Sequence, residues 1–361
     1  MILDEQNILF LTRSMKLGGT ENVILQLCET LQPKVNKIIV CSCGGVNIKK
    51  LSEMGIKHYD IPDLVVKKPK VILLIYRTLK QIIKDENITI IHSHHRMAAI
   101  YAILAGKKEM IKIVNVHNTF QDKKMFTKIA YTGTKIIAVG EQVKKNLTDF
   151  YGIPNSRITV IHNAIKPFTN IINPIEELLD AKKHGCTLIG NIGRLSEQKG
   201  MEYFIEAAAK VYREFPKARF FIIGDGEDAE KLKLIAKKVL PDGIINFMGY
   251  HSDIQNIICQ LDFIVLSSLW EGLPLTPIEA FSVGKTIVAT SVDGTPEIVK
   301  DKKNGLLVVP KDIEVLANGM LVLCNNPQIR EEYGIRAKET YNRAFSLATL
   351  KDRYITYYIG L

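Results

Sequence analysis

Two glutamates bracket a loop in the second half of the chain. Glu271 and Glu279 lie in the segment 262–279, which is predicted to be a buried strand (263–266), a loop rich in Ser, Gly and Pro, and the start of a helix. Gly272 lets the backbone approach a ligand closely, and the helix start offers free N–H groups to an anion. A strand that ends in such a loop is the usual place for a ligand site in an α/β sheet.

The same residues also have a purely structural interpretation. Thr276, Pro277 and Glu279 match a capping box, with Thr276 as the N-cap, Pro277 at the first helical position and Glu279 at the third. Glu271 is then a solvated loop residue. Taken alone, this segment supports the two interpretations about equally.

Two basic residues follow another predicted strand. The loop 193–200 comes after the strand 188–192 and carries Arg194 and Lys199 ahead of a helix. Arg can hold a diphosphate through two parallel hydrogen bonds, and Lys acts as a mobile point charge. The pattern favours a phosphate site, and its alternative is a pair of surface cations.

The first half of the chain carries weaker signals. Gly18 and Gly19 separate a predicted strand from a helix and allow close approach of a phosphate or sugar. They lack the dinucleotide-binding fingerprint, and an ordinary tight turn fits them as well. His117 ends a predicted strand and is placed to hydrogen-bond a ligand hydroxyl, although a lone His is more often structural.

Two clusters suggest metal ligands but are better explained otherwise. The histidines of the segment 92–95 alternate between faces and have no acidic or Cys partner nearby, so we expect strand-end hydrogen bonds rather than ligation. The acidic segment 225–228 follows a strand and opens a helix, which predicts a turn and favourable charge at a helix start. We therefore expect no metal site.

The order of the predicted elements indicates the fold class. Short apolar runs alternate with amphipathic stretches, which predicts α/β architecture with parallel sheets covered by helices on both faces. Residues 166–186 interrupt this rhythm and are predicted to link two doubly wound domains, 1–165 and 187–345, with a helix in 346–361 completing the first. The predicted strands are 8–11, 37–41, 57–61, 89–92, 112–116, 136–139, 159–161, 188–192, 219–223, 245–248, 263–266, 286–289 and 305–308.

Several motifs together resemble one known family, the retaining glycosyltransferases of family four, which have the GT-B fold of two Rossmann-like domains. The resemblance covers nearly the whole chain and is strongest from Leu188 to Pro310. The motifs are Gly193-Arg194-Leu195 with Lys199-Gly200, Glu271-Gly272-Leu273-Pro274-Leu275 with Glu279-Ala280, Gly284-Lys285, Asp293-Gly294-Thr295-Pro296-Glu297 and Asn304-Gly305-Leu306-Leu307-Val308. One departure is the segment 160–164, where relatives have Pro before Asn163 and Gly after it, so His162 receives no role.

The resemblance implies a retaining, metal-independent hexosyltransferase that uses a nucleotide-diphosphate sugar and no cofactor. UDP is the favoured nucleotide, although the segment 249–251 near the base does not decide it. Retention without an evident carboxylate nucleophile implies front-face attack. By this resemblance the catalytic residues are His117, Glu271, Arg194 and Lys199, and the donor is bound by Gly18, Gly19, Arg194, Lys199, Glu271, Gly272, Leu273, Pro274, Leu275 and Glu279.

Rival activities remain open from the sequence. A glycoside hydrolase would use Glu271 and Glu279 as its carboxylate pair, but the phosphate-binding pair and the single Trp270 argue against it. A sugar-nucleotide epimerase and a non-catalytic nucleotide-binding module are the other two. A glycosyltransferase with a soluble acceptor is a further alternative.

The charge distribution points to an anionic partner of the first half. Residues 1–165 carry 24 Lys and Arg against 13 Asp and Glu, which gives +11, and the remainder carries 24 against 25, which gives −1. Lys67, Lys68 and Lys70 precede an amphipathic segment, 71–84, which predicts peripheral contact with an anionic membrane and a saccharide acceptor that is lipid-linked or a polysaccharide precursor. The alternative is that this helix only packs on the sheet.

Composition limits the location. The six cysteines contain no CxxC pair and the first residues lack the apolar core of a secretory signal, so we expect a cytoplasmic protein at the inner face of the cell membrane. No nucleic acid partner is expected.

Overall fold

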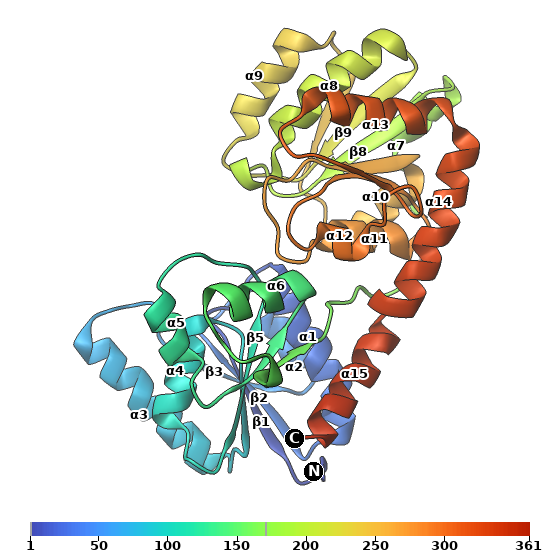
Figure 1. The fold of residues 1–361 in the computed structure, drawn as a ribbon. Helices are drawn as coiled ribbons and strands as arrows, with labels where there is room; N and C mark the ends of the chain where they lie inside the picture. The colour runs from blue at the N-terminus through green and yellow to red at the C-terminus, as the bar shows by residue number, and fades with distance from the viewer. Residues whose placement is uncertain (1, 170–171) are drawn as a thin grey trace. The chain divides into compact units, whose positions relative to one another are not determined.

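The protein is described by a computed structural model that covers residues 2–169 and 172–361. The chain divides into two compact units. One unit extends to Asn163 and includes Leu350–Leu361, and the other is Ala164–Thr349. Figure 1 traces the chain through both units, from blue at the N-terminus to red at the C-terminus.

The first unit is built on a seven-stranded sheet in the order β3-β2-β1-β4-β5-β6-β7, with every pair parallel. Its central strands β1, β4 and β5 are largely buried, because helices cover the sheet on both faces. The strands are β1 (Asn7–Leu11), β2 (Lys37–Ser42), β3 (Lys57–Asp60), β4 (Ile90–Ser93), β5 (Ile111–Val116), β6 (Lys135–Ala138) and β7 (Ile158–Val160).

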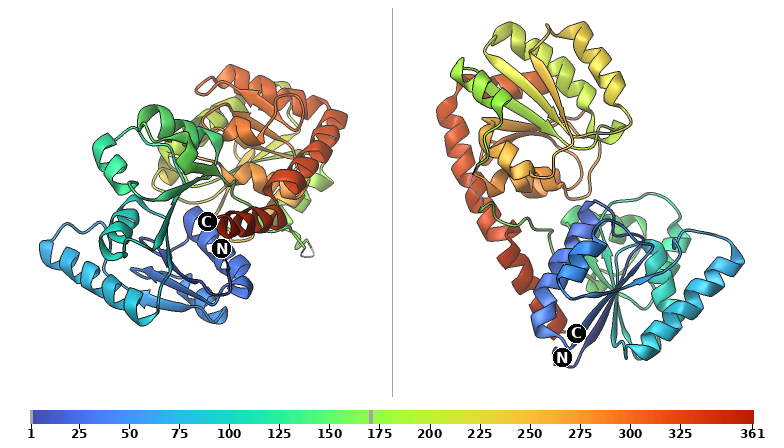
Figure 2. Two further views of the ribbon diagram at one scale, coloured as in Figure 1. Left: turned by 60° about the horizontal axis from the view of Figure 1, so that its bottom comes forward. Right: turned by 180° about the vertical axis from the view of Figure 1, so that it is seen from behind.

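Helices α3 and α4 lie on one face of this sheet, and α1 and α15 lie on the other, as the views in Figures 1 and 2 agree. The helix α6 continues into a π-helical turn at Asn146–Phe150. The helices are α1 (Gly19–Leu31), α2 (Ile48–Glu53), α3 (Pro69–Asp85), α4 (Arg96–Ala105), α5 (Lys124–Ala130), α6 (Glu141–Lys145) and, from the chain's end, α15 (Leu347–Ile359).

The second unit has a six-stranded parallel sheet in the order β10-β9-β8-β11-β12-β13. The strands are β8 (Thr187–Ile192), β9 (Ala218–Ile223), β10 (Ile245–Gly249), β11 (Phe263–Leu266), β12 (Ile287–Thr290) and β13 (Leu306–Val308). The helices are α7 (Glu176–Lys183), α8 (Met201–Glu214), α9 (Ala229–Val239), α10 (Ile254–Gln260), α11 (Leu275–Ser282), α12 (Thr295–Ile298), α13 (Ile313–Asn325) and α14 (Pro327–Thr340).

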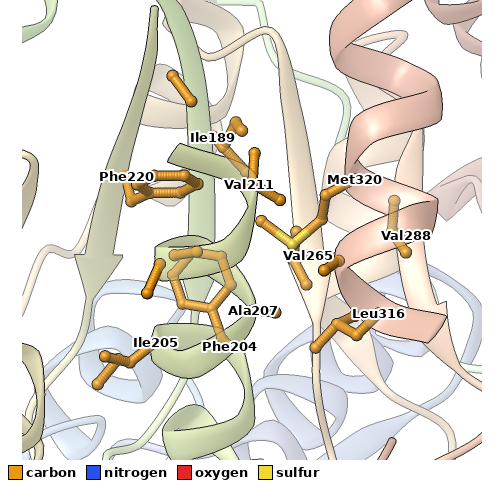
Figure 3. Close-up of a cluster of buried hydrophobic side chains, with 14 of the residues drawn as sticks. Ile189, Phe204, Ile205, Ala207, Val211, Phe220, Val265, Val288, Leu316 and Met320 are labelled. Carbon is orange, nitrogen blue, oxygen red and sulfur yellow. The ribbon is translucent and has the colours of Figure 1, made fainter. Parts of the chain in front are cut away.

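The core of the second unit holds this sheet in place. Phe204 of α8 packs edge-on against Phe220 of β9, with ring centroids 6.0 Å apart, and Met320 of α13 is fully buried in the same cluster (Figure 3). Burying one such side chain contributes about 1.5–3 kcal/mol. This apolar cluster therefore holds in place the strands whose ends carry the site.

The observed strands match the predicted ones to within about one residue at each end. The predicted linker differs from the structure in its second half, because α7 lies within it and contacts β8 as part of the second unit. Its residues 170–171 lie outside the described residues. None of the described helices is long and apolar enough to cross a bilayer.

Candidate functional site

The strand order of the second unit reverses between β8 and β11, and the loops after these two strands carry the candidate site. Neighbours β9 and β12 lie on the outer sides of this pair. A crevice forms at the carboxyl ends of strands where successive connections leave in opposite directions. The loop after β8 includes Arg194 and Lys199, and the loop after β11 includes Glu271.

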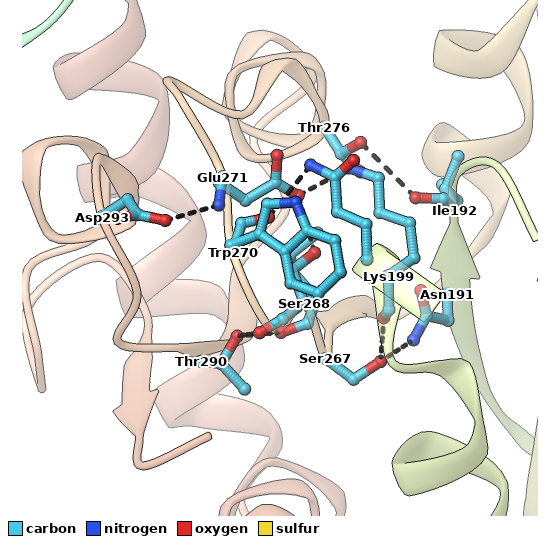
Figure 4. Close-up of polar contacts among 12 residues, drawn as sticks. Asn191, Ile192, Lys199, Ser267, Ser268, Trp270, Glu271, Thr276, Thr290 and Asp293 are labelled. Carbon is cyan, nitrogen blue, oxygen red and sulfur yellow. Dashed lines mark hydrogen bonds and ion pairs between the residues drawn. The ribbon is translucent and has the colours of Figure 1, made fainter. Parts of the chain in front are cut away.

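Lys199 and Glu271 form a mostly buried ion pair at this edge. The Lys199 Nζ lies 2.6 Å from Glu271 Oε1, and the side chains are only 17% and 6% exposed. Ser268 donates its hydroxyl hydrogen to the same Oε1 atom at 2.6 Å. Figure 4 shows the lysine and the serine converging on this carboxylate. The pair therefore places one cation and one carboxylate in a largely water-excluded position.

Hydrogen bonds between neighbouring side chains and its backbone hold the loop that carries Glu271. Asp293 accepts a hydrogen bond from the Glu271 N–H at 2.7 Å, and Thr290 donates to the Ser268 carbonyl at 2.6 Å. Ser267 donates to the Lys199 carbonyl at 2.9 Å, which ties the two loops together. These hydrogen bonds thus connect the segments at the carboxyl ends of strands β8, β11 and β12.

Glycine is required where these loops cross. A Cβ on Gly294 would lie 2.1 Å from the Gly272 carbonyl oxygen, and a Cβ on Gly200 would lie 2.4 Å from the Ser267 carbonyl oxygen. Gly200 also has φ 54°, in the left-handed region that favours glycine. The close approach of the Gly272 backbone to a ligand stays a prediction.

The predicted capping box does not form. Helix α11 begins at Leu275 with Pro274 as its N-cap residue, and no side chain caps it. Thr276 lies inside the helix, where its hydroxyl makes a long contact of 3.5 Å with the Ile192 carbonyl. The extended backbone of Pro274 lets the helix begin two residues early, so Glu279 lies in the second turn and cannot reach an N-cap N–H.

Glu279 is instead a partly buried carboxyl group beside Lys199. Burial raises the pKa of Glu279 to about 7, and the charge of Lys199 acts in the opposite direction. Within the described residues no hydrogen bond to this carboxyl group is formed. A group with its hydrogen-bonding capacity unused at a strand-end edge is suited to binding hydroxyl groups of a ligand.

Arg194 faces a different environment from Lys199. Its side chain is 73% exposed and its Nε donates to Glu227 at 3.1 Å. Glu227 belongs to the acidic segment that was predicted to be a turn and helix start, and α9 does begin directly after it at Ala229. The two cations therefore share one loop, but one is enclosed and the other points to solvent.

The remaining predicted residues lie in the first unit. Gly18 and Gly19 form the start of α1, and a Cβ on Gly18 would lie 2.4 Å from the Glu21 carboxylate. His117 follows β5, and its Nε2 lies 3.2 Å from Nδ1 of His94. Burial lowers the pKa of His117 to about 4, so the ring is neutral at neutral pH.

A polar network behind His117 was not predicted from the sequence. His92 accepts a hydrogen bond from the Tyr358 hydroxyl at 2.6 Å and contacts Asn115 Oδ1 at 2.9 Å. Asn115 in turn donates to the Tyr354 hydroxyl at 2.8 Å. The His92 ring stacks on His94, which stacks on His117. No local pattern reveals the bonds to Tyr354 and Tyr358, because these residues lie more than 200 positions from Asn115 and His92.

The structure shows no candidate metal site in the segments 2–169 and 172–361. These contain no group of three or more His, Cys, Asp or Glu side chains arranged to hold an ion. His92 in β4 and His94 directly after it form hydrogen bonds, as the sequence predicts, and their rings also stack on one another.

Comparisons with known proteins match both halves of the chain. The family model described as "Glycosyl transferases group 1" matches residues 180–340, and "Glycosyltransferase Family 4" matches residues 17–167. A curated Escherichia coli protein, "UDP-Gal:alpha-D-GlcNAc-diphosphoundecaprenol alpha-1,3-galactosyltransferase", is 26% identical over 96% of this chain and 94% of its own length. The Staphylococcus aureus "Poly(ribitol-phosphate) alpha-N-acetylglucosaminyltransferase" is 25% identical over 96% of this chain and 70% of its own.

Solved structures share the fold over the full length. A glycosyltransferase from Rickettsia africae superposes with a TM-score of 0.85 at 23% identity, covering 98% of both chains. The Anabaena protein Alr3699/HepE, solved in complex with UDP, gives a TM-score of 0.84 at 18% identity over 99% of this chain and all of its own. These likenesses confirm the predicted two-domain GT-B architecture.

Proposed function

This chain belongs to the group 1 glycosyltransferases. From that membership we propose that it transfers the sugar of a UDP-sugar to a lipid-linked saccharide acceptor, with retention of configuration. The single observation that carries the donor site is the enclosed Lys199–Glu271 pair where the strand order of the second sheet reverses. The exposed Arg194 and the N–H groups at the start of α11 complete a set of groups suited to a diphosphate.

Each donor group has a proposed role. Lys199 and Arg194 hold the diphosphate and stabilise the negative charge that grows on it as the sugar–phosphate bond breaks. Glu279 accepts hydrogen bonds from the ribose hydroxyls. Glu271 and the backbone of residues 272–275 hold the donor sugar.

The proposed transfer reaction needs no nucleophile from the protein. The bond between the sugar C1 and the phosphate oxygen breaks, an acceptor oxygen forms the new glycosidic bond on the same face, and its proton passes to the leaving phosphate oxygen. The protein supplies position and charge stabilisation for this step.

The relatives support the choice of substrates. The Escherichia coli relative is named for a UDP-sugar donor and a diphosphoundecaprenol-linked acceptor, and the Anabaena and Staphylococcus aureus neighbours were solved with UDP. UDP and a lipid-linked saccharide are therefore the first substrates to examine.

Thermal-shift measurements with UDP, GDP and ADP test the donor. UDP is expected to raise the unfolding midpoint at lower concentration than the others, because a ligand that binds only the native state stabilises it. Assays with UDP-sugars then separate the rival activities: conversion of donor without acceptor indicates an epimerase, release from a simple glycoside indicates a hydrolase, and binding without any turnover indicates a binding module. The anomeric configuration of the product, measured by NMR, tests retention.

Metal independence is a prediction of its own. Lys199, Arg194 and the start of α11 provide positive charge for the diphosphate, so turnover is expected to persist in excess EDTA. The assay compares initial rates with EDTA and with added Mg²⁺. Loss of activity that Mg²⁺ restores contradicts this mechanism and turns attention to Asp225 and Asp228.

A further inference from the structure

The second unit contains a cavity of about 560 Å³ at the edge of its sheet opposite to the candidate donor site. Asp262 directly precedes β11, Lys285 and Thr286 directly precede β12, and all three line the cavity. Glu271 instead follows β11. The cavity therefore lies at the amino ends of strands whose carboxyl ends carry the donor site. Substrates of open α/β sheets bind at the carboxyl ends, so a ligand in this cavity is not expected to take part in the transfer.

One face of α14 forms the opposite wall of the cavity. Its lining residues recur every three or four positions along the helix, which is the spacing of a single helical face. A Cβ on Gly334 would lie 2.4 Å from the Gly284 carbonyl oxygen, so α14 and the loop before β12 are in direct contact. Lys338 of α14 also donates to the Ser282 carbonyl at the end of α11. The two walls are therefore held together without a ligand.

Lys285 has no partner in this cavity. Its amino group forms no hydrogen bond or ion pair within residues 2–169 and 172–361, although the side chain is partly buried. Burial and the charge of Lys182 lower the pKa of Lys285, and Asp262 opposes them only in part. A partly buried cation without a partner destabilises the free protein, and an anion in the cavity would supply that partner.

Two further cations, Arg330 and Lys338, line the cavity in fixed positions. The Arg330 Nη1 donates to the Leu323 carbonyl at 2.6 Å, and its Nη2 lies 4.0 Å from Asp262. Asp262 also accepts a hydrogen bond from the Leu188 N–H at 2.7 Å. The partly buried lining thus holds three cations against one carboxylate, which leaves a positive surplus.

The other charged groups of the lining are the carboxylates of Glu331 and Glu339. Both residues are exposed and form no ion pair with another described residue. Water and salt screen exposed charges more than enclosed ones, so these carboxylates offset the enclosed cations only in part. Their repulsion of an anion is weak enough to be measured as a change in affinity.

We propose that this cavity binds the phosphate groups of a small metabolite through Lys285, Arg330 and Lys338, as a second anion site separate from the donor site. A neutral sugar would leave Lys285 without an opposite charge, and a polyamine would bring further cations beside three enclosed ones. The site goes beyond the proposed function, because it requires neither a UDP-sugar nor an acceptor.

Isothermal titration calorimetry of the full chain with inorganic pyrophosphate tests the site, in saturating UDP so that the donor site is occupied. Pyrophosphate is expected to bind about tenfold or more tightly than acetate, and less tightly as salt increases. Lys285→Gln and Lys338→Gln are each expected to weaken its binding by about tenfold or more, since each removes a charge-assisted contact. Glycerol 3-phosphate is the second probe: if it binds more tightly than pyrophosphate, the metabolite is a phosphate monoester, and if less tightly, a diphosphate.

Two variants are expected to bind pyrophosphate more tightly. Glu331→Gln and Glu339→Gln each remove a carboxylate from the lining, so the affinity should rise, and a gain of affinity cannot result from misfolding. Arg336→Gln is the matched control, because Arg336 is an exposed cation of the same helix outside the cavity lining. Its affinity for pyrophosphate should equal that of the wild-type protein.

Three results would overturn the proposal. The first is no binding of pyrophosphate or glycerol 3-phosphate in the presence of UDP. The second is equal weakening in Arg336→Gln and in the two lysine variants, which would show attraction by net charge alone. The third is binding of spermidine in place of pyrophosphate, which would indicate a cation site at the exposed carboxylates.

The same titrations separate this site from the proposed function. UDP affinity is measured in each variant without pyrophosphate. A chain that binds UDP but not the two phosphate probes refutes the second anion site and leaves the proposed function intact. A chain that binds no UDP, but binds pyrophosphate in a manner that depends on Lys285, refutes the donor assignment alone.

Discussion

At the scale of single residues, Lys199 and Arg194 differ although the sequence places them together. Lys199 neutralises a carboxylate that is 6% exposed, whereas Arg194 pairs with Glu227 in solvent. Breaking a buried ion pair leaves one charge without compensation, while an exposed pair contributes little to stability. The structure therefore assigns Lys199 a stabilising role that the sequence did not indicate.

Alanine variants of the two cations are expected to separate stability from binding. Lys199→Ala should lower the free energy of unfolding by about 3 kcal/mol, whereas Arg194→Ala should change it by less than about 0.5 kcal/mol. Both should weaken UDP binding by roughly tenfold or more, because each loses a charge-assisted contact. Urea denaturation and calorimetry measure the two effects.

The double variant Lys199→Ala/Glu271→Gln serves as the control for this prediction. It removes the uncompensated charge, so it should be more stable than Lys199→Ala alone while still binding UDP weakly. A double variant that is no more stable than the single one would show that the ion pair is not the source of the effect.

Glu279 is expected to make stability depend on pH. Its folded-state pKa of about 7 exceeds the ordinary value of 4.5, so the folded protein holds a proton there that the unfolded chain releases. Its contribution to stability is complete below about pH 4.5 and is lost as pH rises to about 7. Because the side chain retains some exposure, we expect an effect of about 1–2 kcal/mol.

Glu279→Gln provides the comparison. The free energy of unfolding of each protein is measured at pH 5 and at pH 7.5, and the decline between them should be smaller in the variant. UDP affinity should also fall in the variant, because an amide is a poorer acceptor for two ribose hydroxyls than a carboxylate. Identical pH profiles with unchanged affinity would contradict both roles.

At the scale of elements, α15 links the end of the chain to the sheet of the first unit. Tyr354 and Tyr358 are fully buried and hydrogen-bond to Asn115 and His92. The histidine stack that ends at His117 rests on these bonds. The helix therefore positions a candidate site residue without belonging to the site.

Tyr358→Phe is expected to lower the free energy of unfolding by about 1–3 kcal/mol, since it leaves the buried His92 Nδ1 without a donor. Tyr357→Phe is the matched control on the same helix. The Tyr357 hydroxyl is buried and has no partner in the described part of the chain, so its removal should be neutral or stabilising. Equal losses in the two variants would show that packing, and not the hydrogen bond, anchors α15.

The start of α3 combines the two interpretations that the sequence left open. Ile75, Leu79, Ile82 and Ile83 pack on the sheet, which is what a doubly wound domain requires. Ile72, Leu73 and Leu74 in the first turns are exposed beside Lys67, Lys68 and Lys70. The helix therefore packs on the sheet along one face and leaves an apolar surface with adjacent cations.

At the scale of the whole molecule, the excess of 11 positive charges in residues 1–165 and these exposed residues predict binding to anionic membranes. The protein should sediment with liposomes that contain anionic lipid, and less so as salt increases. Replacement of Lys67, Lys68 and Lys70 by Glu should abolish sedimentation, because each cation contributes about 1 kcal/mol near such a surface.

A charge-matched variant controls for the change in net charge. Lys237, Lys238 and Lys217 lie in the second unit, and their replacement by Glu alters total charge equally. This variant should still sediment with anionic liposomes. Failure of the wild-type protein to bind at low salt would favour a soluble acceptor.

The sequence by itself determined the elements and the general place of the donor site. Every predicted strand forms, because short runs rich in apolar residues between helical patterns favour a parallel sheet covered on both faces. Glu271, Lys199 and Arg194 follow strand ends in the sequence, and strand ends in a parallel sheet meet at one edge. Their proximity to the sheet edge was therefore predictable.

Only the tertiary structure decided which groups pair, which are enclosed and where α11 begins. The Lys199–Glu271 ion pair joins positions 72 residues apart, and the Tyr358–His92 hydrogen bond joins positions 266 apart. A local stretch of sequence does not indicate which residues so far apart along the chain come into contact. Thr276 fits a capping box by sequence, yet the backbone at Pro274 and the nearby Ile192 carbonyl place it inside the helix. Long-range packing overrides local preference wherever the two compete for the same backbone.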